Sequence, residues 1–349
     1  MVRLFSAMFF YTFCLFFTIA FATKVAKADL SNEFQQMEEE LSYYSSDYSY
    51  NYNYNYDYGD TLLRKKLQSY VVFYIDGFFA KSFIQIVNDV RAMGVPIPSS
   101  LFLTFGDQEN YFRTNKIAFY RVPIGSFASM EDNSKTILKA INNQKIVGNK
   151  KVIIITHSKG GLDLLQALLD HPELKQKIAG WIALQTPFQG SPLVSLFDSN
   201  RALNSIWRSF LALLRANYQS FSCMTSEFMS NYFSQNSTSI QDALTDLPKI
   251  TVGTYVEADY FRSIIEFMKG DLSILNPLTI YLNNHLEGGK NDGFVPVKGM
   301  CLDSKDCLTL PDMDHAAAIM DVPLFKSLGK EQRLHLTKVL LLMLLQRIV

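Results

Sequence analysis

The feature that most constrains the fold is the stretch of residues 150–171, KKVIIITHSKGGLDLLQALLDH. Its first half is an apolar, β-branched run, which predicts a strand buried on both faces, as in the middle of a parallel sheet. The run breaks at the six residues 156–161, Thr-His-Ser-Lys-Gly-Gly. A leucine-rich helical pattern begins directly after them. A strand, a sharp turn and a helix in direct succession form the unit from which parallel α/β sheets are built.

The same alternation of strands and helices continues along the chain from residue 61. We expect further strands at 69–79, 99–106, 177–187, 249–258 and 278–284, and helices at 130–146 and 330–349. Residues 190–248 interrupt this rhythm with a helical, aromatic-rich pattern. The predicted fold class is therefore α/β: a mostly parallel central sheet over 61–349, with helices on both faces and a helical cap inserted at 190–248.

The N-terminus has the pattern of a secretory signal. Arg3 precedes a long apolar run, and residues 26–28, Ala-Lys-Ala, match the A-x-A cleavage pattern. We expect residues 1–28 to be removed by cleavage after Ala28, which places the mature protein in a secreted or periplasmic location. The alternative is an uncleaved N-terminal segment that anchors the protein in a membrane.

Residues 29–60 do not have the pattern of a folded domain. Tyrosine alternates there with asparagine, serine and aspartate in a low-complexity tract. We expect this segment to form a disordered tether, with binding of a surface partner as its alternative role.

Charge and cysteine content narrow the function classes. Lys+Arg 33 and Asp+Glu 33 give a formal net charge of zero, so no basic surface is expected to attract nucleic acid. Cys301 and Cys307 bracket five residues, a spacing that predicts a local disulfide in an oxidising compartment. No further Cys or His stands near this pair at ligand spacing, so we expect no metal site there.

Ser158 stands where a nucleophile is placed in this kind of unit. The sharp turn after the strand holds such a serine in a strained backbone conformation, with its hydroxyl above the sheet edge. Small residues are needed on both sides of it, which Gly160 supplies, whereas Thr156 is bulkier than the usual glycine. The following helix begins near Lys159 and offers free N–H groups to a developing oxyanion. Ser158 is therefore predicted to be a nucleophile, with a helix-capping serine as the alternative.

A nucleophilic serine needs a base, and the base needs a group that orients it. Of the five histidines, His315 lies in PDMDHAAAIM, a polar loop that runs into an apolar helical start. We predict that His315 is the base, and His285 is the second candidate.

The orienting acid is predicted from the segment GGKNDGFVPVKG, residues 288–299. Asp292 is followed there by a glycine, which permits a tight turn that aims the carboxylate inward. The plainer interpretation is an Asp-Gly turn with a solvated side chain. Asp312 and Asp314 are alternatives, although both lie very close to His315 in the sequence.

These segments together resemble motifs of the α/β-hydrolase superfamily, in particular its bacterial triacylglycerol lipases and esterases. VIIITHSKGG resembles the nucleophile elbow, QTPFQGSP the segment after the next strand, NDGFVPV the acid loop and DMDHAAAI the histidine loop. The chain order Ser158, Asp292, His315 is the order found in that fold. The resemblance spans about residues 69–345 and implies a serine ester hydrolase with a mobile lid over an apolar acyl pocket. Some relatives bind a structural calcium near the acid loop, but the sequence offers no recognisable ligand set for it, so we expect no metal and no cofactor.

The resemblance also implies an oxyanion hole. YIDGFF, residues 74–79, is similar to the oxyanion loop, so the backbone N–H groups of Phe78 and Lys159 would bind the oxyanion. Asp76 stands where lipases carry a histidine. A carboxylate beside a developing oxyanion is unfavourable unless it is turned away or paired.

The function expected from the sequence is hydrolysis of a small-molecule or lipid ester, with transient contact to a lipid interface through the cap. The same three residues would also serve an amidase, a thioesterase, a polyester depolymerase or an acyltransferase. A non-catalytic, hydrolase-like binding protein is the alternative from another class, and Asp76 and Thr156 are the features that favour it.

Overall fold

The computed structural model describes residues 30–46, 57–78, 104–213, 217–257, 276–285, 289–320 and 328–348. The expected signal segment and the centre of the tyrosine-rich tract, 47–56, lie outside these ranges. Within them, no helix is long and apolar enough to span a bilayer.

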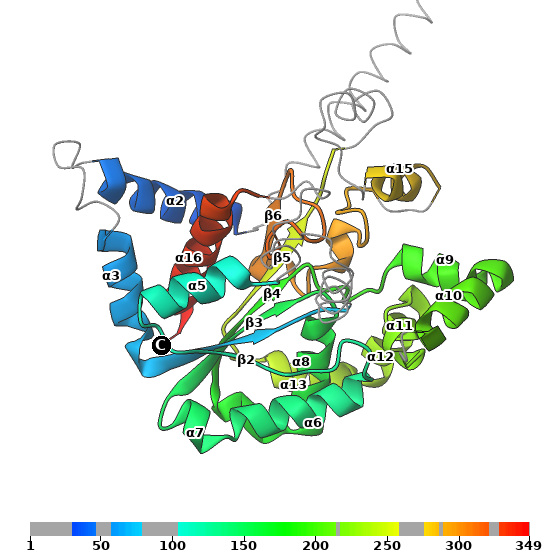
Figure 1. Cartoon of the computed structure of the whole chain (residues 1–349), viewed down its shortest axis with the longest axis horizontal. Coiled ribbons are helices and arrows are strands. Elements are labelled where there is room, and N and C mark those ends of the chain that lie inside the picture. Colours follow the sequence, from blue (N-terminus) through cyan, green and yellow to red (C-terminus); the bar gives the residue numbers. More distant parts are fainter. Residues whose placement is uncertain are drawn as a thin grey trace, which may run out of the picture.

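A parallel sheet organises the molecule (Figure 1). Its strands are β1 (Tyr70–Ile75), β2 (Phe119–Arg121), β3 (Lys151–His157), β4 (Ile178–Leu184), β5 (Lys249–Thr254) and β6 (Cys307–Leu310). In the described part of the chain they pair in the order β2-β1-β3-β4-β5-β6, and every neighbouring pair is parallel. All strands therefore end at the same edge, where ligands bind in open α/β sheets.

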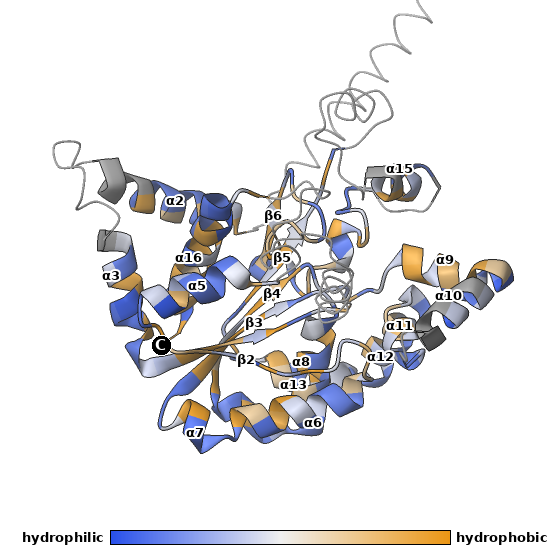
Figure 2. Cartoon of the chain, in the orientation of Figure 1, coloured by the Kyte–Doolittle hydropathy of each residue, from blue (hydrophilic) through white to orange (hydrophobic). Residues whose placement is uncertain are grey.

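Helices cover both faces of the sheet (Figure 1). One face carries α2 (Ser31–Ser46), α3 (Asp57–Lys66), α5 (Gly106–Thr114) and α16 (Lys330–Arg347), and the other carries α6 (Met130–Ile141), α7 (Gln144–Val147), α8 (Lys159–Asp170) and α13 (Ser237–Leu244). Side chains of β1 alternate between the two layers, because Val72 and Tyr74 join the first core whereas Val71 and Phe73 join the second. Hydrophobic residues accordingly concentrate along the strands (Figure 2).

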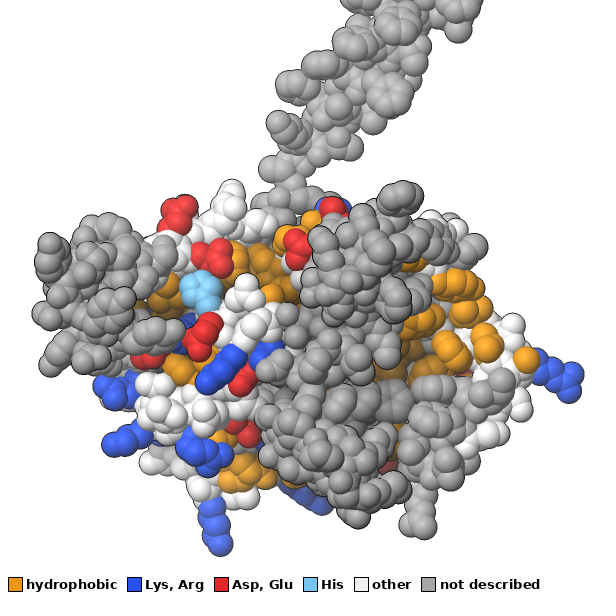
Figure 3. Space-filling view, turned by 45° about the horizontal axis from the view of Figure 1, so that its top comes forward, with side chains coloured by type: hydrophobic (Ala, Val, Ile, Leu, Met, Phe, Trp, Pro, Cys, Tyr) orange, Lys and Arg blue, Asp and Glu red, His pale blue; other side chains and the backbone are white. Residues whose placement is uncertain are grey.

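Between β4 and β5 the chain forms the helices α9 (Pro192–Ser199), α10 (Arg201–Leu213), α11 (Gln219–Ser222) and α12 (Ser226–Gln235), followed by α13. This is where the sequence predicts a helical cap. α9 and α10 extend past the sheet, whereas α13 packs against α8 in the body of the domain. Hydrophobic side chains gather on the side of the molecule that carries α9 and α10 (Figure 3).

One of the expected strands is wrong, and another cannot be followed. Residues 278–284 lie in a helix, α15 (Asn276–His285), since a short apolar run does not distinguish a buried strand from a buried helix. The strand expected at 99–106 lies mostly outside the described residues, and its described end forms a turn that leads into α5. Strands β2 and β6 were not expected, because each is only three or four residues long.

The disorder expected for 29–60 is wrong for residues 31–46 and 57–60, which form α2 and the start of α3. Leu30, Phe34 and Met37 are buried in the core beside α16; Phe34 and Met37 lie three residues apart on one face of helix α2, and Leu30 directly precedes it. The backbone N–H of Leu30 donates to the carbonyl of Cys307 at 3.0 Å. The low-complexity tract that follows hid this amphipathic helix in the sequence.

Candidate active site

Ser158 lies between the end of β3 and the start of α8, in a backbone conformation that few residues other than glycine adopt. Its φ is 51° and its ψ is −128°. A Cβ atom at Gly160 would come within 2.4 Å of the carbonyl oxygen of Asp76, and one at Gly161 within 2.1 Å of Thr186 Oγ1. The turn therefore needs two glycines, since neighbouring segments pack directly on the start of α8. This is the tight strand-turn-helix geometry expected from the sequence.

Replacing Gly160 by alanine is expected to lower the free energy of unfolding by about 1–3 kcal/mol, because the new methyl group must displace the backbone of Asp76. Urea denaturation of the two proteins measures this difference. Gly329→Ala is the matched control, since its Cβ would meet its nearest neighbour, Gln332 Oε1, at an ordinary 3.4 Å. Equal losses in both variants would contradict this account of the turn.

Three side chains from distant parts of the sequence form a hydrogen-bonded chain at the carboxyl edge of the sheet. His315 Nε2 lies 2.9 Å from Ser158 Oγ, and His315 Nδ1 lies 2.7 Å from Asp292 Oδ2. Asp292 is fully buried, and its other oxygen, Oδ1, accepts the backbone N–H groups of Phe294 at 2.9 Å and Val295 at 2.8 Å. These contacts fix the orientation of the carboxylate toward the imidazole.

The other candidates for acid and base are placed differently. Asp314 Oδ1 accepts the backbone N–H of Ala316 at 3.1 Å and so stabilises the turn after His315. Asp312 lies in the same loop with a φ of 57°. The side chain of His285 lies outside the described part of the structure.

His157 supports the loop of His315, a role that the sequence did not reveal. The ring is buried, and its Nε2 lies 2.7 Å from the backbone oxygen of His315 and 3.2 Å from Gln185 Oε1. Both partners are acceptors, so Nε2 carries the proton. Gln185 in turn donates to the carbonyl of Asp314 at 2.7 Å and to Thr254 Oγ1 at 2.5 Å. The only sequence signal was the position of His157 next to Ser158.

Burial, together with the nearby His315, lowers the pKa of His157 to about 3. The unfolded chain therefore binds a proton at this ring below pH ~6.5, whereas the folded chain does not. The stability contributed by neutral His157 is complete above pH ~6.5 and is lost as the pH falls toward 3, by at most about 1.4 kcal/mol per pH unit.

We expect His157→Gln to flatten this acid dependence, because glutamine does not titrate. The measurement is the free energy of unfolding from urea titrations at pH 7.5, 6 and 5. His335→Gln, at a side chain that is 43% exposed, is the control. A variant at 157 that loses stability with acid as steeply as the wild type would show that this ring is not the cause.

The residues predicted for the oxyanion hole lie on either side of Ser158. A Cβ at Gly77 would come within 2.8 Å of Ser158 Cβ, so the chain leading to Phe78 passes directly beside the serine. Lys159 is the first residue of α8, where backbone N–H groups have no partner within the helix. The structure thus brings Phe78, Ser158 and Lys159 to one place.

The charge of Lys159 is neutralised in the core. Its Nζ forms a 2.6 Å ion pair with Asp163, and Asn133 donates to the other oxygen of that carboxylate at 2.8 Å. Burial raises the pKa of Asp163 to about 6, although Lys159 acts to lower it. The side chain of Lys159 therefore has a structural partner, and only its backbone N–H remains a candidate for the oxyanion hole.

The carboxylate of Asp76 is paired. Its Oδ1 accepts the hydroxyl of Thr104 at 2.6 Å, and its Oδ2 accepts Nη1 of Arg121 at 2.9 Å. This satisfies the condition under which a carboxylate next to the oxyanion loop is tolerated. Thr156, the other departure from the lipase pattern, is fully buried, and its hydroxyl accepts the indole N–H of Trp181 at 2.9 Å.

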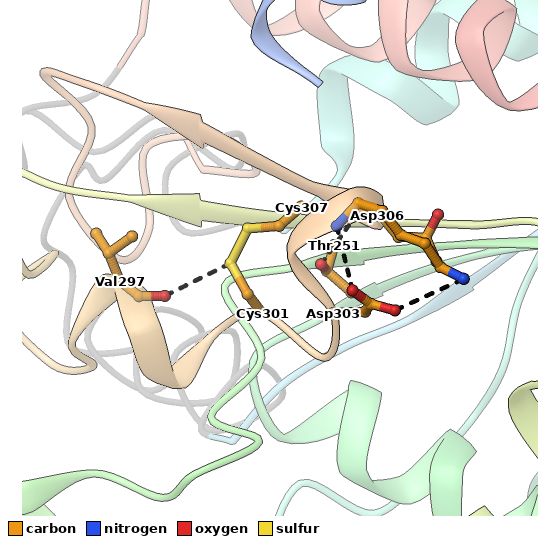
Figure 4. The surroundings of a disulfide bond; sticks show 7 residues. Thr251, Val297, Cys301, Asp303, Asp306 and Cys307 are labelled. Atoms are coloured by element: carbon orange, nitrogen blue, oxygen red, sulfur yellow. Dashed lines mark hydrogen bonds and ion pairs between the residues drawn. A yellow bond between two sulfur atoms is a disulfide. The ribbon is translucent and has the colours of Figure 1, made fainter. Parts of the chain in front are cut away.

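A disulfide joins Cys301 to Cys307 in the connection between the acid loop and β6 (Figure 4). The hydroxyl of Thr251 on β5 donates to the carbonyl of Asp306 in the same loop at 3.1 Å. Cys223 is a free, buried thiol, and burial raises its pKa to about 12, which favours the protonated form at neutral pH. Among the described residues no group of three metal-ligating side chains is found.

No protein-family model matches the sequence, and no curated protein sequence matches it significantly. Solved structures do resemble the fold. The lipase BlEst2 of Bacillus licheniformis in its mature form has a TM-score of 0.50 at 21% identity, covering 70% of this chain and 84% of that one. Its propeptide form has a TM-score of 0.51 at 21% identity, covering 70% and 46%. A metagenomic carboxyl esterase, MGS0156, has a TM-score of 0.47 at 16% identity, covering 77% and 76%.

The two BlEst2 structures show that this chain has the fold expected from the sequence, an α/β-hydrolase fold. Its parallel sheet with helices on both faces agrees with them.

Proposed function

We propose that the protein is an exported serine hydrolase that cleaves carboxylic esters. The observation that carries this proposal is the chain from Asp292 through His315 to Ser158, with contacts of 2.7 and 2.9 Å, built on a strained turn at the carboxyl edge of the sheet. A buried carboxylate, an imidazole and a serine hydroxyl in this order are the parts needed for nucleophilic acyl transfer.

In this mechanism Ser158 Oγ attacks the ester carbon while His315 Nε2 takes its proton. The carbonyl oxygen becomes an oxyanion, which the backbone N–H groups of Phe78 and Lys159 stabilise. The C–O bond then breaks, the alcohol leaves with the proton from His315, and an acyl-enzyme remains. Water, activated by the same imidazole, releases the acid and restores the serine. Asp292 stabilises the imidazolium throughout.

Aromatic side chains favour an apolar acyl group. The half-buried ring of Phe78 lies 5.2 Å from that of Phe127 and 6.2 Å from that of Phe221, and the ring of Phe294 lies 4.9 Å from that of His315. One solved structure with this fold is a lipase by name. The hydrophobic surface on the side of α9 and α10 supports transient contact of the cap with a lipid interface (Figure 3).

Export is proposed from the signal pattern of residues 1–28 and from the disulfide between Cys301 and Cys307, which persists in an oxidising compartment. Anchoring by an uncleaved N-terminal segment is the alternative, and in either case the tyrosine-rich tract would be free to meet a surface partner.

The proposal is tested with p-nitrophenyl esters from acetate to palmitate, together with a matched anilide and thioester, on the purified full chain. A fluorophosphonate probe should label the wild type and not the Ser158→Ala variant. Hydrolysis of the esters supports the proposed function, and the chain-length optimum distinguishes an esterase from a lipase. Preference for the anilide or thioester would favour an amidase or thioesterase. A folded wild type that neither hydrolyses an ester nor takes up the probe would contradict the proposal and favour a binding protein.

A further inference from the structure

The segment Asp76-Gly77-Phe78 is wedged against the turn of Ser158. The carbonyl of Asp76 lies where a Cβ at Gly160 would stand, and Gly77 leaves no room for a side chain beside Ser158 Cβ. The position of the Phe78 N–H therefore depends on how this short segment is held. Donors in an oxyanion hole act only when they are aimed to within a fraction of an ångström.

A single guanidinium holds the Asp76 end of that segment. Arg121 is the last residue of β2 and pairs in register with Tyr74 of β1. Its Nη1 donates to Asp76 Oδ2 and to Thr104 Oγ1, both at 2.9 Å, and its Nη2 donates to the carbonyl of Thr104. Its Nε donates to Glu109 Oε1 of α5 at 2.6 Å. One planar group thus links Thr104, Glu109 of α5 and the residue that precedes Gly77-Phe78.

The buried carboxylate of Asp76 needs the positive charge of Arg121 beside it. The side chain of Asp76 is only 5% exposed, and an unpaired carboxylate there would repel the negative charge that develops on the substrate oxygen. Burial acts to lower the pKa of Arg121, but Asp76 and Glu109 raise it by more, so the guanidinium stays charged. The remaining acid of the network, Glu109, lies on the far side of Arg121 and is 22% exposed.

We propose that Arg121 is a positioning residue for the oxyanion hole, acting through Asp76. It neutralises the carboxylate and fixes the Asp76-Gly77-Phe78 segment so that the Phe78 N–H points at the developing oxyanion. This inference rests on the proposed function for its effect on catalysis, whereas the fixing of the segment does not depend on it.

The test compares Arg121→Met, Arg121→Lys and a matched control, Arg347→Met. Arg347 has a similarly exposed side chain (22% against 26%) and also bridges two carboxylates, Glu33 at 2.7 Å and Asp306 at 3.2 Å, at the end of α16. For Arg121→Met we expect kcat on p-nitrophenyl butyrate to fall by about 100-fold with KM little changed, since a misplaced donor is felt mainly in the transition state. Arg121→Lys should recover part of the loss, and Arg347→Met should keep the wild-type kcat.

Two further readouts separate positioning from a loss of stability. A trifluoromethyl ketone bonds to Ser158 Oγ, its carbonyl oxygen becomes an oxyanion, and the serine proton passes to His315. Its affinity should fall in parallel with kcat for Arg121→Met. Hydrogen exchange at the peptide that covers residues 70–78 should become faster in Arg121→Met and stay unchanged in Arg347→Met.

A double-mutant cycle with Asp76→Asn tests the route of the effect. If Arg121 acts through Asp76, removing it from the Asp76→Asn variant should change kcat little further. If the two substitutions instead lower kcat by independent factors that multiply in the double variant, Arg121 does not act through Asp76. Unchanged exchange at 70–78 in Arg121→Met would overturn the proposal even in an active enzyme. An inactive wild type with faster exchange in Arg121→Met would instead contradict the proposed function and leave the positioning of the segment supported.

Discussion

Replacing Ser158 by alanine is expected to lower kcat for ester hydrolysis by about 10⁶-fold, the scale on which loss of the nucleophile acts in serine hydrolases. The physical reason is that His315 Nε2, 2.9 Å from Ser158 Oγ, then has no hydroxyl to deprotonate. The fold should survive, because the strained φ of 51° is imposed by the packing around Gly160 and Gly161 and not by the hydroxyl. Residual turnover would come from the oxyanion donors and from substrate binding.

The measurement is the steady-state rate on the best ester of the p-nitrophenyl series, with folding checked by urea denaturation. Ser134→Ala is the matched control. Ser134 is also fully buried, but it lies on α6 and donates to Asp170 Oδ2 at 2.6 Å, away from His315. A Ser158→Ala protein that keeps even a tenth of the activity would exclude Ser158 as the nucleophile.

The substitution Asp292→Asn is expected to lower kcat for ester hydrolysis by about 10⁴-fold at neutral pH, although asparagine has the same shape as aspartate. The oxygen of the new amide must accept the N–H groups of Phe294 and Val295, as Asp292 Oδ1 does now. Its NH₂ group then faces His315 Nδ1, which must become an acceptor. The ring proton moves to Nε2, where it points at Ser158 and blocks deprotonation of the hydroxyl.

The rate of Asp292→Asn is measured against Asp306→Asn. This variant also removes a paired carboxylate, but one that directly precedes β6 and pairs with Lys249 and Arg347. We expect the second variant to keep the wild-type kcat. Full activity in Asp292→Asn would mean that the imidazole needs no orienting carboxylate. The role proposed for Asp292 would then be wrong.

The elements that the sequence predicted well are those with strong local signals. β3 and α8 are adjacent in the chain, and the β-branched run, the two glycines and the leucine periodicity are all visible within about twenty residues. The last helix, α16, is also predicted from the sequence, because its many apolar residues lie within one short window. By contrast, the sequence predicts a strand where α15 forms and disorder where α2 forms, because the structure of short or polar segments depends on what packs against them.

In the candidate site, too, the sequence predicts the features that have a local signal and misses those that depend on tertiary contacts. Ser158, Asp292 and His315 each lie in a short motif with glycines or polar turns around it, so residue type and chain order make them the leading candidates, with His285, Asp312 and Asp314 as alternatives. Which of several aspartates faces the imidazole was not decided by sequence. It depends on the turn of 292–295, whose N–H groups hold one oxygen and aim the other.

The sequence by itself predicted the α/β architecture and named Ser158, Asp292 and His315 as candidate site residues, because periodicity, glycine spacing and residue type are properties of short windows. Only the tertiary structure showed that His157 supports the loop of His315, 158 residues away, and that Arg121 pairs with Asp76, 45 residues away. Those contacts arise because parallel strands bring their carboxyl ends to one edge, and no local pattern carries information about which distant side chains will meet there.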